Sequence, residues 1–299
     1  MIAAGCMASV ADFEILKAQA LLGEGVLWDW RRDELWWTDI QGRALYRHGW
    51  SAASTRVMPT AERLGSFGLV AGSTRLIAAF ESGIAMYEPD EASLEWLARP
   101  EEVGPGLRFN DGRVDRAGRF WCGTMVEDRS TGATGCLYSF DARAGLRQHV
   151  RGIRISNGLC TSPDGTRLYF ADSAARTIWV HELIEPDGTL GEPRVFAKTP
   201  RGVSPDGAAV DVEGCVWSAQ WGAGAVVRYT PEGEIDRRIE IPATQPSCVC
   251  FAGPDLDVLC VTTARVDLDE ATLRAEPHAG DVFLLRTGVQ GLPEPEYRP

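Results

Sequence analysis

Four side chains that carry oxygen ligands stand one or two residues before a glycine at widely separated points of the 299-residue chain: Glu24, Asn110, Asn157 and Asp206. Two carboxylates and two carboxamides suit a hard divalent cation such as Ca²⁺, Mg²⁺ or Mn²⁺ better than thiolates or imidazoles would. The two carboxylates would also balance the charge of a divalent ion. Asn-Gly and Asp-Gly are common turn dipeptides as well, so local turn chemistry is the alternative explanation.

The position of these residues within a repeated sequence unit favours a common site. The unit is a polar turn with Gly or Asp, then an apolar pair that often includes an aromatic residue, then small polar residues. Its central apolar position recurs every 41 to 48 residues, at Leu35, Leu76, Phe120, Leu168, Val216 and Leu259. Each of the four oxygen-bearing residues precedes that position by 10 or 11 residues, and Ser66 and Cys248 stand there in the two remaining units. Side chains at one place of every repeat converge if the repeats form a ring.

A repeat of this length with several short strand-like runs per unit is typical of a β-propeller. Turn signals such as Pro163-Asp164-Gly165 separate the runs, and the nearest approach to an amphipathic helix, Asp269 to Glu276, is short. The sequence therefore predicts an all-β fold, a six-bladed β-propeller, in a single domain over residues 1–299. Residues 1–15 are expected to form a loose N-terminal segment or a closing strand.

The composition excludes several classes of partner. The 42 acidic residues outnumber the 30 basic ones and give a net charge of −12, which argues against nucleic acid or an anionic membrane as a partner. No apolar run reaches the roughly 18–20 residues of a membrane span. The eight cysteines show no C-x-x-C pair and no disulfide framework. We therefore expect a reducing compartment, the cytoplasm.

Other catalytic signals are weak. The four histidines show no metal-binding spacing, and none of them stands at the oxygen-bearing place of the repeat. A G-x-S-x-G sequence is absent, which argues against a serine hydrolase. Trp36, Trp121 and Trp217 recur in phase with the repeat and are expected between blades, whereas Trp221 is compatible with either the core or a pocket wall.

A family resemblance rests on four segments: Leu22-Gly23-Glu24-Gly25, Arg108-Phe109-Asn110-Asp111-Gly112-Arg113-Val114-Asp115, Ile155-Ser156-Asn157-Gly158-Leu159 and Pro205-Asp206-Gly207. They resemble motifs of the regucalcin, gluconolactonase and luciferin-regenerating-enzyme family, in the same order, and the likeness extends from about residue 20 to 285. The resemblance implies a six-bladed propeller with one catalytic divalent metal and, in many members, an activity that opens sugar lactones.

The resemblance also implies roles for the metal-binding residues. Glu24, Asn157 and Asp206 match the family's metal ligands, and Asp206 matches the residue proposed as proton acceptor and donor. The implied cofactor is one divalent metal ion. Ca²⁺ is expected first, and Mn²⁺, Mg²⁺, Zn²⁺ and Fe²⁺ are the alternatives.

Three further residues are implied to contact the substrate. Arg108 and Asn110 match residues that hold it, and Asp128 aligns with a further contact that is a Glu in the animal members. The chain departs from the family pattern at Asp128, because the loop from Glu127 to Gly135 is shorter and polar. The size of the substrate and the behaviour of this loop are therefore not predicted.

The resemblance implies metal-assisted hydrolysis of an aldonolactone to the aldonic acid in a cytoplasmic sugar-oxidation pathway. The expected partner is a small-molecule sugar lactone, and no protein partner is implied. One alternative is another metal-dependent propeller hydrolase that acts on organophosphates or aryl esters. It would need an apolar channel mouth, which Arg108, Asp111 and Asp128 do not favour. The other alternative is a non-catalytic calcium-binding regulator, which would bind metal without turning over lactones.

Overall fold

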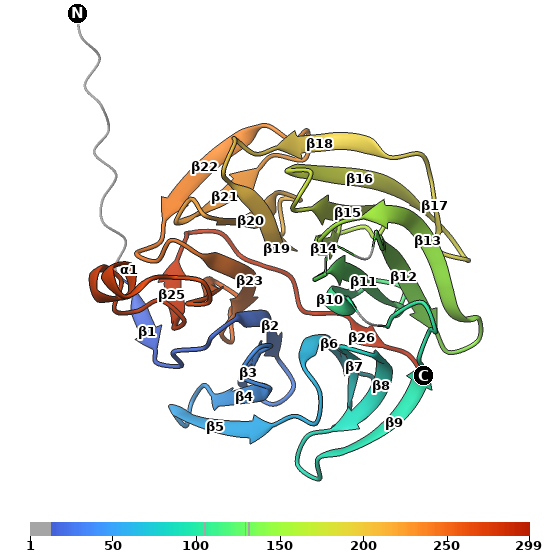
Figure 1. Cartoon of the computed structure of the whole chain (residues 1–299), viewed down its shortest axis with the longest axis horizontal. Coiled ribbons are helices and arrows are strands. Elements are labelled where there is room, and N and C mark those ends of the chain that lie inside the picture. Colours follow the sequence, from blue (N-terminus) through green and yellow to red (C-terminus); the bar gives the residue numbers. More distant parts are fainter. Residues whose placement is uncertain (1–12, 105, 129, 131) are drawn as a thin grey trace, which may run out of the picture.

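The computed structural model describes residues 13–104, 106–128, 130 and 132–299. Within these residues the strands form six mainly antiparallel sheets that follow one another along the chain. Figure 1 shows the sheets arranged around a central axis as the blades of a propeller. The predicted six-bladed β-propeller is thereby confirmed. Among the helices of the described chain, none is long and apolar enough to cross a membrane.

The first three blades comprise the following strands: β2 (Gly23–Asp29), β3 (Glu34–Asp39), β4 (Ala44–Gly49) and β5 (Ser54–Pro59); β6 (Leu64–Val70), β7 (Leu76–Phe80), β8 (Gly83–Glu88) and β9 (Ser93–Ala98); and β10 (Leu107–Val114), β11 (Phe120–Val126), β12 (Gly135–Asp141) and β13 (Gly145–Ile153). In these three blades the strands follow one another outward in chain order, from β2, β6 and β10 near the axis.

The last three blades comprise these strands: β14 (Ser156–Thr161), β15 (Arg167–Asp172), β16 (Thr177–Ile184), β17 (Thr189–Leu190) and β18 (Arg194–Lys198); β19 (Ser204–Val210), β20 (Val216–Trp221), β21 (Ala225–Tyr229) and β22 (Ile235–Glu240); and β23 (Pro246–Ala252), β24 (Val258–Thr263), β25 (Val282–Arg286) and β1 (Glu14–Leu16). The short helix α1 (Glu270–Ala275) lies in the connection from β24 to β25.

Burial decreases from the axis to the rim of each blade, and the sequence of each strand follows this gradient. All residues of β6 and β23 are buried, and these strands are short continuous runs of small and apolar residues. The rim strands β5 and β22 are mostly exposed and carry many polar residues. Trp36, Trp121 and Trp217 lie in apolar clusters that join neighbouring blades, as their repeat phase predicts.

Both ends of the described chain close the ring. Strand β1 pairs with β25 and completes the last blade. Residues 1–12 lie outside the described residues. Strand β26 (Glu296–Tyr297) pairs with β6, and Figure 1 shows the C-terminal segment crossing the centre of the ring to reach it. There Glu294 accepts a hydrogen bond from Arg113 at 2.7 Å.

Candidate active site

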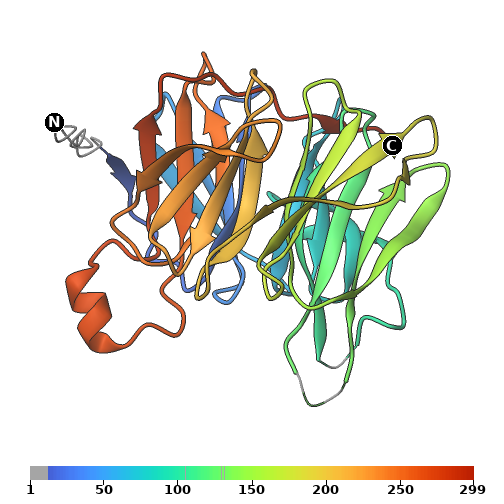
Figure 2. The ribbon, with the colours of Figure 1, turned by 90° about the horizontal axis from the view of Figure 1, so that it is seen from above.

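The oxygen-bearing place of the repeat falls on the innermost strand of every blade. The six residues at this place, in chain order from β2 to β23, are Glu24, Ser66, Asn110, Asn157, Asp206 and Cys248. The four predicted side chains among them all line one cavity of about 400 Å³. Figure 2 shows the loop between β11 and β12 and the segment of α1 projecting from the same face of the ring. Glu127 and Asp267 belong to these projections and also line the cavity, which therefore opens on that face.

A β-bulge at the repeated place turns each innermost strand toward the channel. In the first blade the register shifts between Glu24 and Leu27, and the strands that carry Asn110, Asn157 and Asp206 shift at the corresponding place. In β6 and β23 the shift comes just before the repeated place, which Ser66 and Cys248 occupy. Gly25 and Gly158 adopt φ angles of 58° and 64°, which an L side chain rarely adopts. A Cβ on Gly207 would lie 2.5 Å from a sulfur atom of the next blade. The glycines beside the polar residues thus permit the bulges that re-aim the side chains.

A directed chain of hydrogen bonds fixes the orientation of the two asparagines. Asn110 donates from Nδ2 to Oδ1 of Asn157 at 2.9 Å. Asn157 in turn donates from Nδ2 to Oγ of Ser173 at 2.8 Å, and the Ser173 hydroxyl donates to the carbonyl oxygen of Pro205 at 2.7 Å. Because Ser173 takes the amide nitrogen of Asn157, the amide oxygen faces Asn110. The chain joins three neighbouring blades and ends one residue before Asp206.

Glu24 and Asp206 form a buried pair of acids in the cavity. Each residue is 6% exposed, and within the described residues neither makes an ion pair. Burial and the charge of Asp111 raise the pKa of Glu24 to about 8. Burial and the charge of Glu24 raise the pKa of Asp206 well above its ordinary value. The Oδ1 atom of Asp206 is buried and has no hydrogen-bond partner in the described part of the chain.

These observations fit a divalent cation. A buried carboxylate oxygen without a partner is costly, and two neighbouring buried carboxylates repel each other. A cation bound between Glu24 and Asp206 would supply the missing partner and keep both groups ionised. Asn157 lines the same cavity, and its amide oxygen is a suitable third ligand for a hard ion.

Arg108 also lines the cavity, where a network of charges holds it. The residue is 3% exposed, and its Nη1 atom donates to Oδ1 of Asn110 at 2.6 Å. Its Nε atom donates to Oε1 of Glu127 at 3.1 Å. Glu127 accepts two further hydrogen bonds from Arg63, at 2.6 and 2.8 Å. The Nη2 atom of Arg108 has no hydrogen-bond partner among the described residues and is the part of the side chain that a ligand can use.

Two acids that the sequence placed at the channel mouth lie elsewhere. Asp128 is fully exposed on the loop after β11, where its Oδ1 atom accepts hydrogen bonds from the backbone and side chain of Ser130. Its neighbour Glu127 lines the cavity instead. Asp111 is buried, and its two oxygens accept backbone N–H groups of Gly112 and Leu159. Asp111 therefore supports the bulge and the adjoining strand.

The structure adds residues to the site that the sequence did not single out. Ser173 and Glu127 line the cavity and orient Asn157 and Arg108, respectively. Trp221, for which the sequence left two positions open, lines the cavity. Ser173 directly follows Asp172, the last residue of the second strand of its blade, and this position is visible in the sequence. Its hydrogen bond to Asn157 could be identified only from the folded chain.

A second acidic cluster lies outside the channel. Ligand atoms of Asp211, Glu213 and Cys215 lie within 4.8 Å of one another. Asp211 accepts hydrogen bonds from Nε1 of Trp217 and from Nε of Arg228, each at 2.8 Å, and Glu213 pairs with the same Arg228. An arginine already supplies the positive charge in this cluster. We therefore assign it to the stability of the blade and not to metal binding.

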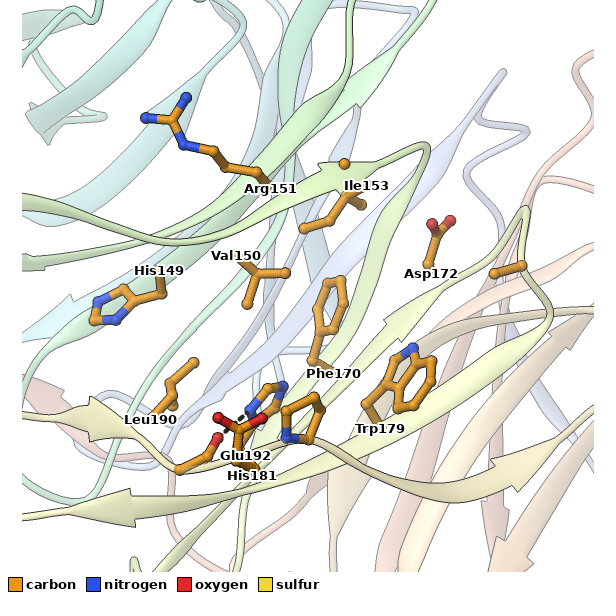
Figure 3. Close-up of a pocket in the computed structure, with 14 residues that line it drawn as sticks. His149, Val150, Arg151, Ile153, Phe170, Asp172, Trp179, His181, Leu190 and Glu192 are labelled. Carbon is orange, nitrogen blue, oxygen red and sulfur yellow. Dashed lines mark hydrogen bonds between the residues drawn. The ribbon is translucent and has the colours of Figure 1, made fainter.

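A cavity of about 540 Å³ lies at the rim, between β13 and β16, and Figure 3 shows the side chains that line it. His149 is hydrogen-bonded to Ser139 at 2.7 Å, and burial lowers its pKa to about 4. His181 is hydrogen-bonded to the carbonyl oxygen of Gly191 at 3.0 Å. The carboxylate of Asp172 accepts three backbone N–H groups. These polar groups serve the local structure, so the channel cavity is the better candidate for the active site.

The fold and the channel cavity define a six-bladed propeller with a carboxylate and carboxamide centre. The model of the SMP-30/Gluconolactonase/LRE-like region matches residues 22–265, and the chain belongs to this family. It is 35% identical to a 6-deoxy-6-sulfogluconolactonase of Pseudomonas putida over 94% of this chain and 96% of that protein. It is 37% identical to an L-arabinolactonase of Azospirillum brasilense over 91% and 90% of the two chains. The structure superposes on a calcium-binding protein, regucalcin, of Agrobacterium tumefaciens with a TM-score of 0.90, 32% identity and coverage of 97% and 98%.

Proposed function

We propose that this protein is a lactonase that hydrolyses a sugar lactone to the corresponding aldonic acid with the help of one divalent metal ion. The observation that carries the proposal is the buried acid pair of Glu24 and Asp206, with an unpartnered carboxylate oxygen, in a polar cavity of the channel. Family membership and the names of the similar proteins, a sulfogluconolactonase and an arabinolactonase, support lactone hydrolysis. Those names include a sulfonated and an uncharged sugar, so they leave the charge of the substrate open.

Glu24, Asn157 and Asp206 are the residues that would hold the ion. When bound, a divalent ion supplies Lewis-acid activation of the lactone carbonyl and stabilises developing negative charge. Ca²⁺ is the first choice, since the donors are all oxygen atoms, and the calcium-binding description of the superposed regucalcin supports it. Mn²⁺, Mg²⁺, Zn²⁺ and Fe²⁺ are the alternatives.

Asp206 acts as general base and then as general acid. Its carboxylate accepts a proton from the attacking water as the water oxygen bonds to the carbonyl carbon. When the bond from that carbon to the ring oxygen breaks, Asp206 returns the proton to the ring oxygen, which becomes a hydroxyl group. Arg108 binds the substrate through its Nη2 atom, and the polar cavity matches a polyhydroxylated ring better than an aryl ester. Asp128 remains a candidate contact if its loop meets the substrate.

Asn110 is proposed to act on the substrate chiefly through its neighbours. Its Nδ2 atom donates to Asn157 and to the carbonyl oxygen of Ser156, and its Oδ1 atom accepts from Arg108. Replacement of Asn110 by Ala should therefore lower kcat/KM for a sugar lactone through Arg108. The loss should be larger than for unsubstituted butyrolactone, which has no hydroxyl groups for Arg108 to bind.

We also propose that residues 1–299 act as one domain in the cytoplasm. The pairing of β1 with β25 and of β26 with β6 joins both ends of the described chain to the ring. The seven described cysteines are buried free thiols, which is usual in a reducing compartment.

A proton-release assay tests the proposed function. The protein is stripped with a chelator, its metal content is measured, and single ions are added back with a set of five- and six-carbon aldonolactones. We expect hydrolysis above the rate without enzyme, only when an ion is present. Full activity of the metal-free protein would exclude the metal. Metal binding without hydrolysis of any lactone would favour the calcium-binding regulator, and preferred hydrolysis of aryl esters or organophosphates would favour the other hydrolase.

A further inference from the structure

The charges around the channel cavity are unevenly distributed. Arg108 is the only basic residue among the described residues that line it, whereas four acids line it: Glu24, Glu127, Asp206 and Asp267. A bound divalent ion would balance Glu24 and Asp206. Whether the rest of the cavity prefers a charged or an uncharged substrate then depends on how far the charge of Arg108 is available to that substrate.

Glu127 forms an ion pair with Arg108 at the cavity. Their ion pair measures 3.1 Å between Nε of Arg108 and Oε1 of Glu127, and the arginine is almost fully buried. Glu127 is itself held by both terminal nitrogens of Arg63, at 2.6 and 2.8 Å. Burial raises the pKa of Glu127, but Arg63 and Arg108 outweigh this effect and hold the pKa below its ordinary value. Glu127 is therefore a fixed negative charge beside Arg108.

The ion pairs continue away from the cavity into the neighbouring blades. Arg63 also donates from Nε to Glu81 at 2.6 Å, and Glu81 lies 3.5 Å from Arg43. Positive and negative groups thus alternate from Arg108 outward, and the first two of them, Arg108 and Glu127, both line the cavity. A substrate anion that approached Arg108 would meet the carboxylate of Glu127 beside it. Like charges brought together in a binding site disfavour the wrong ligand.

We propose that Glu127 is a specificity-determining residue that makes the cavity select uncharged polyhydroxy lactones over lactones that carry a phosphate or sulfonate group. This inference rests on the proposed function, because it concerns the substrate of the same site. Arg108 binds hydroxyl oxygens through its Nη2 atom, and Glu127 compensates its charge. Removal of the charge of Glu127 leaves Arg108 free to bind an anion.

The test compares two lactones of the same ring, D-glucono-1,5-lactone and its 6-phosphate, in three proteins. We expect the wild-type protein to show a kcat/KM for the uncharged lactone at least about tenfold higher, equivalent to ~1.4 kcal/mol. The variant Glu127→Gln keeps the shape of the side chain and should reduce this preference about tenfold, mainly through a lower KM for the phosphate. The matched control Glu81→Gln makes the same exchange further from the cavity and should leave the ratio unchanged.

A binding measurement separates failure of this inference from failure of the proposed function. 1,5-Anhydro-D-glucitol and its 6-phosphate have the same ring and no carbonyl group, so calorimetric titration compares them without any reaction. If no lactone is hydrolysed, the proposed function fails, and the calorimetric ratio still decides the specificity. Equal binding and turnover of charged and uncharged ligands by the wild-type protein would overturn the inference, as would an unchanged ratio in a folded Glu127→Gln variant.

Discussion

Asp206 and Asp211 are two buried acids on one strand, and their surroundings differ completely. Asp206 lies near the start of β19, and Asp211 directly follows its last residue. They are 6% and 0% exposed. Asp211 accepts hydrogen bonds from Trp217, from Arg228 and from two backbone N–H groups. Asp206 has one buried oxygen without a partner among the described residues, and the charged groups that raise its pKa are the acids Glu24 and Asp111. Burial alone does not identify a functional acid, whereas a buried oxygen without a partner in a polar cavity points to one.

A second blade shows that the surroundings of Asp211 belong to the fold. Asp115 follows β10 as Asp211 follows β19, and it accepts hydrogen bonds from Nε1 of Trp121 and from Nε of Arg119, at 2.8 and 2.7 Å. The spacing from Asp to Trp is the same in both blades, with a glycine at the same place between them, at Gly118 and Gly214. Recurrence in a second blade indicates that this motif ties the first two strands of a blade together.

The largest expected difference between the two acids is in kcat. Asp206→Asn keeps an oxygen ligand but removes the base, so kcat for a sugar lactone should fall by about 10²–10⁴, the usual contribution of a general base. Asp211→Asn should retain the wild-type kcat per folded molecule. Proton-release kinetics at saturating metal measure both. A near-normal kcat in metal-loaded Asp206→Asn would show that another group activates the water.

The free energy of unfolding should respond in the opposite order: Asp211→Asn should lower it more than Asp206→Asn does. Asp211→Asn removes the buried charge opposite Arg228, which keeps Glu213 and Asp236 as partners. The cost should therefore be about 1.5–3 kcal/mol, the contribution of hydrogen bonds to a charged group. Asp206→Asn removes one of two buried like charges, so in chelator it should be at least as stable as the wild-type protein. Urea unfolding of both variants in chelator measures the free energy of unfolding. If Asp206→Asn is the less stable of the two, the acid pair is not the strained element that its surroundings indicate.

Metal addition should distinguish the channel from the outer cluster. An ion that binds only the folded protein stabilises it by about 2.7 kcal/mol at one hundred times its dissociation constant. We expect this gain in the wild-type protein and in Asp211→Asn, and a smaller gain in Asp206→Asn. Thermal unfolding with and without added Ca²⁺ or Mn²⁺ gives the comparison. An ion that stabilises Asp206→Asn fully but fails to stabilise Asp211→Asn would move the metal site to the outer cluster.

The sequence predicted the ring and the oxygen-bearing place of the repeat because both depend on local patterns. Turn signals and short apolar runs set the strands, and a glycine beside Glu24 or Asn157 permits the bulge. Individual side-chain contacts in the cavity were not predictable from such patterns. Asp128 was expected at the substrate, but its neighbour Glu127 lines the cavity. A difference of one residue at the end of a strand reverses the direction of the side chain, and motif alignment does not resolve it.

Ser173 offers the finest test of the channel site, because it affects the ligands without touching the reacting atoms. Its hydroxyl accepts from the amide nitrogen of Asn157 and donates to the carbonyl oxygen of Pro205, beside Asp206. Ser173→Ala removes the group that fixes the amide orientation, so the proposed oxygen ligand of Asn157 is no longer held toward the ion. Loss of such a supporting hydrogen bond lowers metal affinity by about 10–100-fold. Calorimetric titration of the metal-free protein measures that affinity.

Ser173→Thr keeps the hydroxyl and is the matched control, so it should bind metal close to the wild-type affinity. The effect should be confined to metal binding: at saturating metal, kcat of Ser173→Ala should approach that of the wild-type protein, since Asp206 is intact. Equal metal affinities of the alanine variant and the wild-type protein would mean that Asn157 either needs no support or is not a ligand. Titration of Asn157→Ala then decides between the two, because only a true ligand lowers the affinity when its oxygen is removed.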